Sequence, residues 1–171
     1  MHSDSQDLQQ LHLLQFIHYT IYTMLSNNQF VRVFALDFSK AFDSIKHEPL
    51  IGKLSSLSIP DEIYNWIESF FSGRGHCIRF GNDMSEIAEI SASIVQGSSL
   101  GPAAYVVTAA DIRPRRDDNV IIKYADDTYL IVPSDNSDTC TEELRHIQAW
   151  ADSNNLRLNA CLLYTSPSPR D

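Results

Sequence analysis

Two strand-like runs separated by only two residues constrain this chain more than any other feature of its sequence. The runs span Asn119–Ala125 and Thr128–Val132, and Asp126-Asp127 lies between them. So short a connection predicts a tight β-hairpin, which places the two strands in antiparallel pairing. The sequence therefore predicts an antiparallel sheet with two carboxylates at one of its turns.

The other elements alternate between helical and strand periods. Val31–Leu36 is a short β-branched and aromatic run, typical of a buried strand, and Asp37 follows it directly. Apolar residues recur at helical spacing over 8–25, 60–71 and 139–151. Ile78–Phe80 and Ile87–Ile94 are further strand-like runs around a polar turn, and a Gly-rich loop begins near Gln96. We therefore expect an α+β fold, with helices packed against an antiparallel sheet.

Composition limits the function classes. A chain of 171 residues with 43% apolar residues can bury a core of its own. Its net charge of −9 argues against a free-standing nucleic-acid binder, because phosphate affinity comes mostly from clustered Lys and Arg. Either catalytic carboxylates lie here and the basic surfaces lie elsewhere, or the chain never touches nucleic acid. Polar residues interrupt the apolar stretch at 11–25, so we expect a buried helix there and no membrane span.

The last eleven residues, CLLYTSPSPRD, resemble the translation of a sequencing-library adaptor. We therefore expect the natural sequence to stop near Ala160, and residues 161–171 to be a non-native, disordered tail excluded from the fold. The alternative is a genuine disordered terminus.

Three features suggest chemistry only in combination. They are Asp37 at a strand end, Asp126-Asp127 at the hairpin, and the loop Val95–Pro102 between them in the chain. Each alone is ordinary turn chemistry. Together they matter more, because adjacent carboxylates repel unless a cation or solvent neutralises them. Hard oxygen ligands at strand ends suit Mg²⁺, and two such ions can clamp an in-line phosphoryl displacement.

These segments resemble, in order, the three palm motifs of non-LTR retrotransposon reverse transcriptases. Phe34–Asp43 is similar to the first motif, Val95–Pro102 to the second and Lys123–Thr128 to the third, and the similarity covers Leu8–Asn159. A group II intron maturase is the nearest family that could be confused with it. The resemblance implies that residues 1–160 are a partial reverse transcriptase domain. This part would be a polymerase palm with a remnant of the fingers, truncated at the fingers and thumb sides.

The resemblance also implies a site. Asp37 and Asp126 would be the main metal ligands, with Asp127 completing the acidic cluster and the backbone carbonyl of Phe38 helping. Two Mg²⁺ ions would be bound, with Mn²⁺ as an alternative. The implied reaction is two-metal transfer of a nucleotide from a deoxynucleoside triphosphate to a primer 3′-hydroxyl on an RNA template.

Three further residues match nucleotide-binding positions of the family. The ring of Phe42 would pack on the sugar and exclude a 2′-hydroxyl, although this ring can equally be a core residue. Gln96 would touch the incoming nucleotide, and Gly97 would allow close approach of the backbone. Val95 departs from the family, which has Pro there, and this replacement removes no ligand. The Lys that the family carries shortly after a segment like Leu156–Asn159 is missing too.

The expected partners are an RNA template, a DNA primer and a deoxynucleoside triphosphate. The fingers, thumb and endonuclease regions of the full-length protein would lie outside this chain, so the fragment alone is expected to be inactive. The expected compartment is intracellular, and nuclear for the full-length element. Two alternatives remain: a decayed, non-enzymatic remnant, and a palm-type nucleotide cyclase or metal phosphodiesterase. The second would lack the Gly-rich loop.

Overall fold

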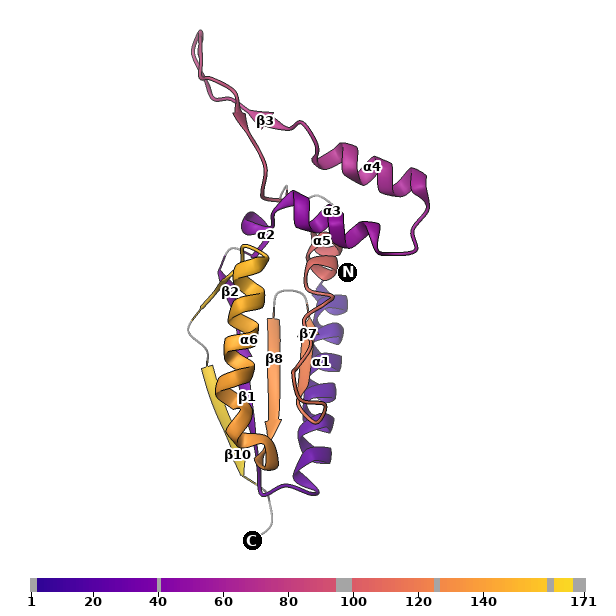
Figure 1. Ribbon diagram of the computed structural model, residues 1–171, viewed down its shortest axis with the longest axis vertical. Coiled ribbons are helices and arrows are strands. Elements are labelled where there is room, and N and C mark those ends of the chain that lie inside the picture. Colours follow the sequence, from indigo (N-terminus) through magenta and orange to yellow (C-terminus); the bar gives the residue numbers. More distant parts are fainter. Residues whose placement is uncertain (1–2, 40, 95–99, 125–126, 160–161, 168–171) are drawn as a thin grey trace. The chain divides into compact units, whose positions relative to one another are not determined.

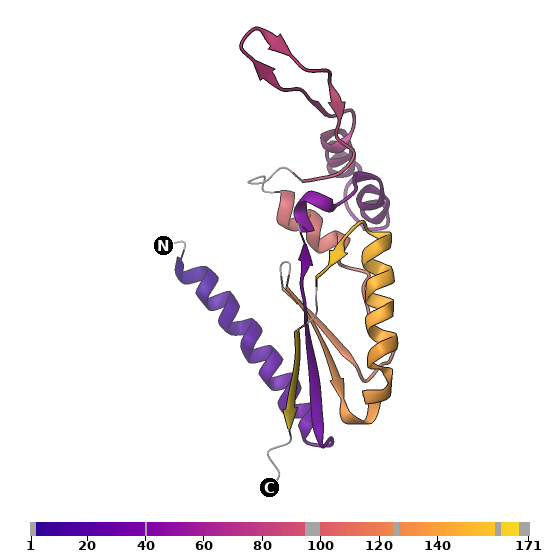
Figure 2. The same ribbon diagram turned by 90° about the vertical axis from the view of Figure 1, so that its left-hand side faces the viewer.

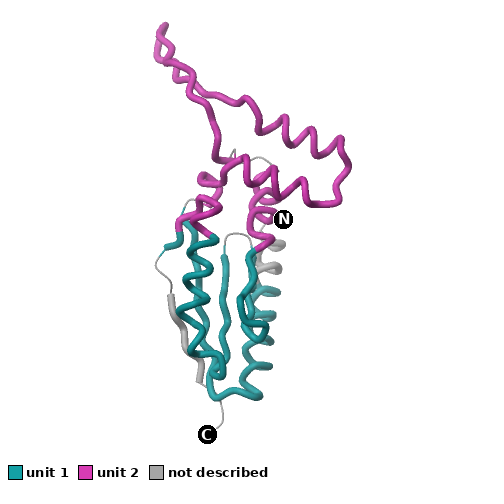
Figure 3. Tube along the Cα trace, in the orientation of Figure 1, with its two compact units in different colours: residues 1–39, 112–150, 158–171 teal, residues 40–111, 151–157 magenta. Residues whose placement is uncertain are grey.

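The computed structural model describes residues 3–39, 41–94, 100–124, 127–159 and 162–167. The chain divides into two compact units, shown in Figure 3. Unit 1 comprises Met1–Ser39, Ile112–Trp150 and Leu158–Asp171, and unit 2 comprises Lys40–Asp111 and Ala151–Arg157. The domain boundary expected at residue 160 stays a prediction.

Unit 1 is built on a four-stranded sheet with the order β10-β1-β8-β7 (Figure 1). Its strands are β1 (Phe30–Leu36), β7 (Val120–Tyr124), β8 (Asp127–Pro133) and β10 (Leu162–Pro167). Every neighbouring pair is antiparallel. The short strands β2 (Phe38–Ser39) and β9 (Arg157–Leu158) lie outside this sheet. The α+β fold with an antiparallel sheet, expected from the sequence, is confirmed.

Alternation along β1 explains how the sheet is covered on both faces. Val31 and Val33 pack into one apolar cluster with Leu13 of α1 (Ser3–Leu25) and with Ile131 of β8. On the other face, α6 (Cys140–Ser153) covers the sheet, so that α1 and α6 lie on opposite sides of it (Figure 2). Because successive strand residues point to opposite faces, an almost wholly apolar strand such as β1 needs a helix on each side.

Helix α1 was expected to be buried, but most of it is not: Leu14, Phe16 and Tyr19 are each more than half exposed, whereas Leu13 and Leu25 are buried. It packs one face against β1 and β8 instead of standing apart. Among the described residues, no helix combines the length and the apolar character needed to cross a membrane.

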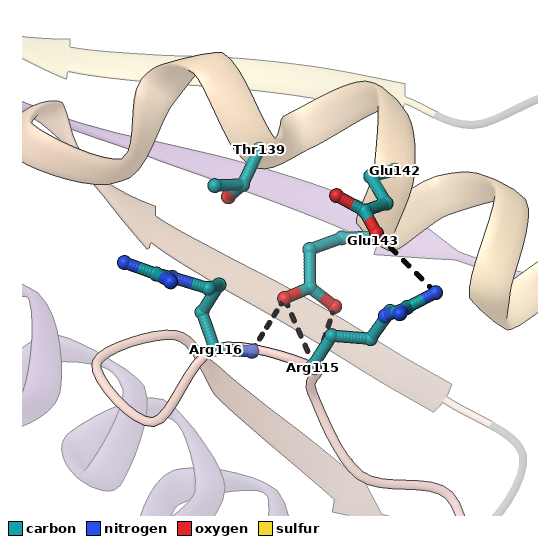
Figure 4. A pocket seen from close by; sticks show the side chains of 5 residues that line it. All are labelled: Arg115, Arg116, Thr139, Glu142 and Glu143. Carbon is teal, nitrogen blue, oxygen red and sulfur yellow. Dashed lines mark hydrogen bonds and ion pairs between the residues drawn. The ribbon is translucent and has the colours of Figure 1, made fainter.

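A buried carboxylate ties α6 to the loop that leads into β7. The Glu143 side chain is wholly buried, and it accepts hydrogen bonds from the backbone N–H groups of Arg115 and Arg116, each at 3.0 Å (Figure 4). It also accepts a hydrogen bond from Asn119 Nδ2 at 2.8 Å. Asn119 Oδ1 in turn accepts a hydrogen bond from Asn136 Nδ2 at 3.1 Å. Asn136 belongs to the 3₁₀ turn η1 (Ser134–Thr139) that precedes α6. One buried charge therefore fixes the start of β7 and the start of α6 together.

Residues 162–167 are a strand where the sequence predicts a disordered tail. β10 pairs with β1 from Phe30↔Pro167 to Ala35↔Leu162. The edge of β1 that faces away from β8 offers a row of backbone N–H and C=O groups, and an extended segment can pair with these groups through its own backbone, whatever its side chains. Strand formation by this segment is thus compatible with a non-native origin, which stays a prediction.

Unit 2 contains four helices and two short strand pairs among its described residues. The helices are α2 (Ala41–Ser44), α3 (His47–Ser55), α4 (Asp61–Phe71) and α5 (Leu100–Thr108). Strand β3 (Gly75–His76) pairs with β6 (Ala88–Glu89), and β4 (Arg79–Phe80) pairs with β5 (Asp83–Met84). The expected turn is formed at 81–82, since Asp83 already belongs to β5, and the strand expected over Ile87–Ile94 is limited to Ala88–Glu89. Gly81 adopts a φ of 63° in this turn, which favours glycine.

Lys53 of α3 links this helix to the end of α5 and to Asn154. Its ammonium group donates hydrogen bonds to the carbonyl oxygen of Thr108 at 2.6 Å and to Asn154 Oδ1 at 2.8 Å, and it forms an ion pair with Asp111 at 2.8 Å. Three donors on one nitrogen are thereby matched to three acceptors, which is the full capacity of a Lys side chain. The apolar core nearby includes Leu50 and Tyr105, both almost fully buried.

Candidate active site

Two of the three predicted catalytic carboxylates lie at the same end of neighbouring strands. The last cross-strand pair between β1 and β8 is Leu36↔Thr128, and both of these residues are buried. Asp37 follows Leu36 and Asp127 precedes Thr128, so each carboxylate residue lies one position beyond that buried pair. Both are exposed. Since neighbouring strands are about 5 Å apart, the two acidic residues are neighbours at this end of the strands.

The hairpin that carries the acidic pair is confirmed, with a shift of one residue in its boundary. Tyr124 pairs with Asp127, and β8 begins at Asp127. The sequence analysis put both Asp126 and Asp127 in the turn, whereas Asp127 is a strand residue. Asp126 lies outside the described residues, and so do the predicted nucleotide-binding residues Gln96 and Gly97.

Asn159 is a residue of this site that sequence reasoning missed. Its backbone N–H donates a hydrogen bond to the carbonyl oxygen of Asp37 at 2.8 Å, and its side-chain Nδ2 donates to Asp37 Oδ2. Ser39 Oγ donates to the amide oxygen Oδ1 of Asn159. The only sequence signal was that Asn159 ends a family-like segment, because no periodicity or local motif links it to a residue so distant in the chain.

Phe38 is positioned for a role of its backbone alone. Its side chain is 4% exposed and packs edge-on against Trp150, with ring centroids 5.9 Å apart. A side chain so buried anchors the backbone next to Asp37. The expected roles of Phe38, as a metal ligand through its carbonyl group and as a nucleotide-binding residue, stay predictions.

Phe42 belongs to unit 2, where its ring contacts the ring of Tyr105. It lies in α2, is half-buried, and its ring centroid is 5.5 Å from that of Tyr105. Its carbonyl oxygen accepts the backbone N–H of Ile94 at 3.0 Å. The ring is thus supported on one side by the core of unit 2. This geometry is compatible with both readings of Phe42, as a core residue and as a surface for a sugar.

The donor set suits a hard divalent cation. Asp37 and Asp127 supply carboxylate oxygens at one edge of the sheet, and oxygen is the ligand that Mg²⁺ and Mn²⁺ accept from proteins. Within the described residues no three His, Cys, Asp or Glu side chains gather as a metal cluster. The third expected ligand, Asp126, is not among them. The described part of the chain therefore holds two carboxylates that could bind such a cation, and hydrogen bonds from Asn159 fix the orientation of Asp37.

Comparison with known proteins shows which family the chain is similar to. A family profile described as "Reverse transcriptase (RNA-dependent DNA polymerase)" matches residues 2–161. The chain is 31% identical over 163 residues to the RNA-directed DNA polymerase from mobile element jockey of Drosophila melanogaster, covering 89% of this chain and 17% of that protein. It is 32% identical over 137 residues to the protein of that name from Drosophila funebris, covering 73% and 15%.

The expected resemblance to reverse transcriptases of non-LTR elements is confirmed by these relatives. The chain spans about a sixth of the length of the relatives that it matches. Since the family profile covers nearly all of the sequence, the chain belongs to the reverse transcriptase (RNA-dependent DNA polymerase) family.

Proposed function

We propose that this chain is the palm part of an RNA-directed DNA polymerase. The observation that carries the proposal is the register of β1 and β8, in which Asp37 and Asp127 flank the buried pair Leu36↔Thr128 at one end of the sheet. Carboxylates from two neighbouring strands, with Asp126 completing the set, are what a divalent-cation site for phosphoryl transfer requires. The substrates are a deoxynucleoside triphosphate and a DNA primer on an RNA template.

The proposed reaction is attack of the primer 3′-oxygen on the α-phosphorus, with pyrophosphate leaving. Asp37, Asp126, Asp127 and the carbonyl of Phe38 would hold two Mg²⁺ or Mn²⁺ ions. When bound, these ions would supply positive charge that favours loss of the 3′-hydroxyl proton and neutralises the phosphates. The strands hold the carboxylates in place before substrate arrives. The rest of catalysis is positioning, with no covalent step on the protein.

Primer extension tests the proposal in the natural full-length protein. With an RNA template, an annealed DNA primer, deoxynucleoside triphosphates and Mg²⁺, we expect extension that EDTA abolishes. The 171-residue chain alone should extend no primer above background, because it spans only 17% of the jockey protein. A full-length protein that extends nothing would be a decayed remnant. Release of pyrophosphate from nucleotides without primer extension would favour a cyclase.

The proposed role of Phe42 predicts a change in sugar selection. Replacing Phe42 by Val in the full-length protein should raise ribonucleotide incorporation relative to deoxynucleotide incorporation by roughly 10-fold or more, because the smaller side chain leaves room for a 2′-hydroxyl. The measurement is the ratio of kcat/KM for the two nucleotides. Phe42→Tyr keeps the ring and should keep the selectivity. A folded Val variant with unchanged selectivity would make Phe42 a core residue only.

A further inference from the structure

We infer that Asn159 and Ser39 are positioning residues, which orient the Asp37 carboxylate so that one of its oxygens is presented to a divalent cation. This inference rests on the proposed function, since it concerns how the proposed cation site is built. It assigns a role to two side chains outside the acidic cluster.

The contacts form a directed chain from hydroxyl to amide to carboxylate. Ser39 Oγ donates to Asn159 Oδ1, and Asn159 Nδ2 donates to Asp37 Oδ2. The backbone N–H of Asn159 also donates to the Asp37 carbonyl oxygen at 2.8 Å. Asp37 is therefore held at its backbone and at its side chain by one residue that lies 122 positions away in the sequence.

Hydrogen-bonding capacity settles the orientation of the Asn159 amide. An ionised carboxylate can only accept hydrogen bonds, so the amide must turn its NH₂ group toward Asp37. Its oxygen then faces Ser39, and the hydroxyl of Ser39 donates to it. Without the Ser39 hydroxyl, the amide oxygen would lose this hydrogen-bond partner, and only the contact with Asp37 would orient the amide. Ser39 thus acts on Asp37 through Asn159.

The amide orients Asp37 without neutralising it. A Lys or Arg in this place would compete with a cation for the carboxylate charge, whereas a neutral amide takes one oxygen and leaves the full charge. Among the described residues, no Lys or Arg forms an ion pair with Asp37, and no hydrogen bond reaches Oδ1. Oδ2 is held by Asn159, so Oδ1 is the oxygen that remains for a cation.

Fixing an exposed carboxylate matters because its rotamers are otherwise free. Asp37 is exposed, so little packing restrains its side chain. Partners that hydrogen-bond a metal ligand from behind typically change metal affinity by about 10–100-fold when they are removed. We therefore expect the Asn159 amide to contribute to cation affinity, although it is not itself a ligand.

Mn²⁺ binding to the 171-residue chain, followed by the electron paramagnetic resonance signal of free Mn²⁺, tests the inference without an activity assay. Asn159→Ala should raise the Mn²⁺ Kd by roughly 10-fold or more. Ser39→Ala should raise it too, while Ser39→Thr, which keeps the hydroxyl, should not. Asn155→Gly is the matched control. The Asn155 amide donates to the Ser44 carbonyl, and glycine tolerates its φ of 58°.

The Asp37→Asn variant separates the inference from the proposed function. If Asp37→Asn binds Mn²⁺ as tightly as the unmodified chain, the proposed cation site itself is wrong. If Asp37→Asn loses binding while Asn159→Ala and Ser39→Ala keep it, only the positioning role is overturned. Circular dichroism reports whether each variant is folded. Should Asn159→Ala fail to fold, the two Ser39 variants still test the inference. Equal Mn²⁺ affinities for Ser39→Ala and Ser39→Thr would refute the positioning role and leave the proposed cation site standing.

Discussion

Replacing Asp37 by Asn in the natural full-length protein should slow primer extension by roughly 10²- to 10³-fold or more. Loss of charge stabilisation at a reacting phosphate costs about 3–4 kcal/mol or more, which is two to three powers of ten in rate. The change is isosteric, so the contacts of the neighbouring strands should persist. The measurement is the single-turnover rate of nucleotide addition at saturating Mg²⁺, together with the Mg²⁺ concentration needed for half-maximal rate.

Two comparisons make this prediction specific. Asp83→Asn removes an exposed carboxylate from the β4–β5 hairpin of unit 2 and should leave the rate nearly unchanged. The double variant Asp37→Asn with Asp127→Asn should be only slightly slower than Asp37→Asn alone. The effects of substitutions at residues that hold one cation together are not additive. If the rate of the Asp37→Asn variant stays within about 3-fold of the rate of the unmodified protein, this result would argue against both the cation site and the palm assignment.

Replacing Glu143 by Leu should lower the free energy of unfolding by about 3 kcal/mol or more. The Glu143 carboxylate is 0% exposed and accepts three N–H donors, from Arg115, Arg116 and Asn119. Leu leaves these donors without an acceptor, and each unsatisfied buried donor costs about 1–3 kcal/mol. Urea unfolding of the 171-residue chain, followed by circular dichroism, measures the effect. Unchanged stability would mean that water can replace the carboxylate.

The neighbouring Glu142 provides a matched control for this stability effect. Its side chain is 59% exposed and its carboxylate lies 3.3 Å from Arg115 Nη1 (Figure 4). An exposed ion pair contributes about 0–1 kcal/mol, so Glu142→Gln should change stability little. The loss of stability caused by Glu143→Gln should lie between those caused by Glu143→Leu and Glu142→Gln. Its amide oxygen can replace Oε1, which accepts all three donors, while its NH₂ group replaces Oε2 and cannot accept.

Local sequence was sufficient for the elements that carry the site. The β-branched run before Asp37 predicted β1, and two runs with a two-residue connection predicted the hairpin of β7 and β8. The helical spacing of apolar residues over 60–71 predicted α4, which the structure places at Asp61–Phe71. These signals are local, because side-chain period and turn length act between residues close in the chain. The order of the three motifs was likewise enough to indicate the family.

Contacts between distant residues were beyond the reach of the sequence. Glu142 and Glu143 are adjacent and chemically identical, yet only Glu143 is buried, because the loop before β7 packs over that side of α6. The tail at 162–167 forms a strand because β1 has an open edge, a property of the sheet and not of the tail.

The sequence by itself determined the α+β class, the hairpin, and the positions of the carboxylates at strand ends. Only the tertiary structure decided that Asp37 and Asp127 flank the pair Leu36↔Thr128, and that Asn159 and Ser39 orient Asp37. Strand register depends on which apolar faces bury together, and the Asn159 contact depends on the chain returning to Asp37 after α6. Both follow from packing of the whole chain, since no short-range pattern records which distant residue will become a neighbour.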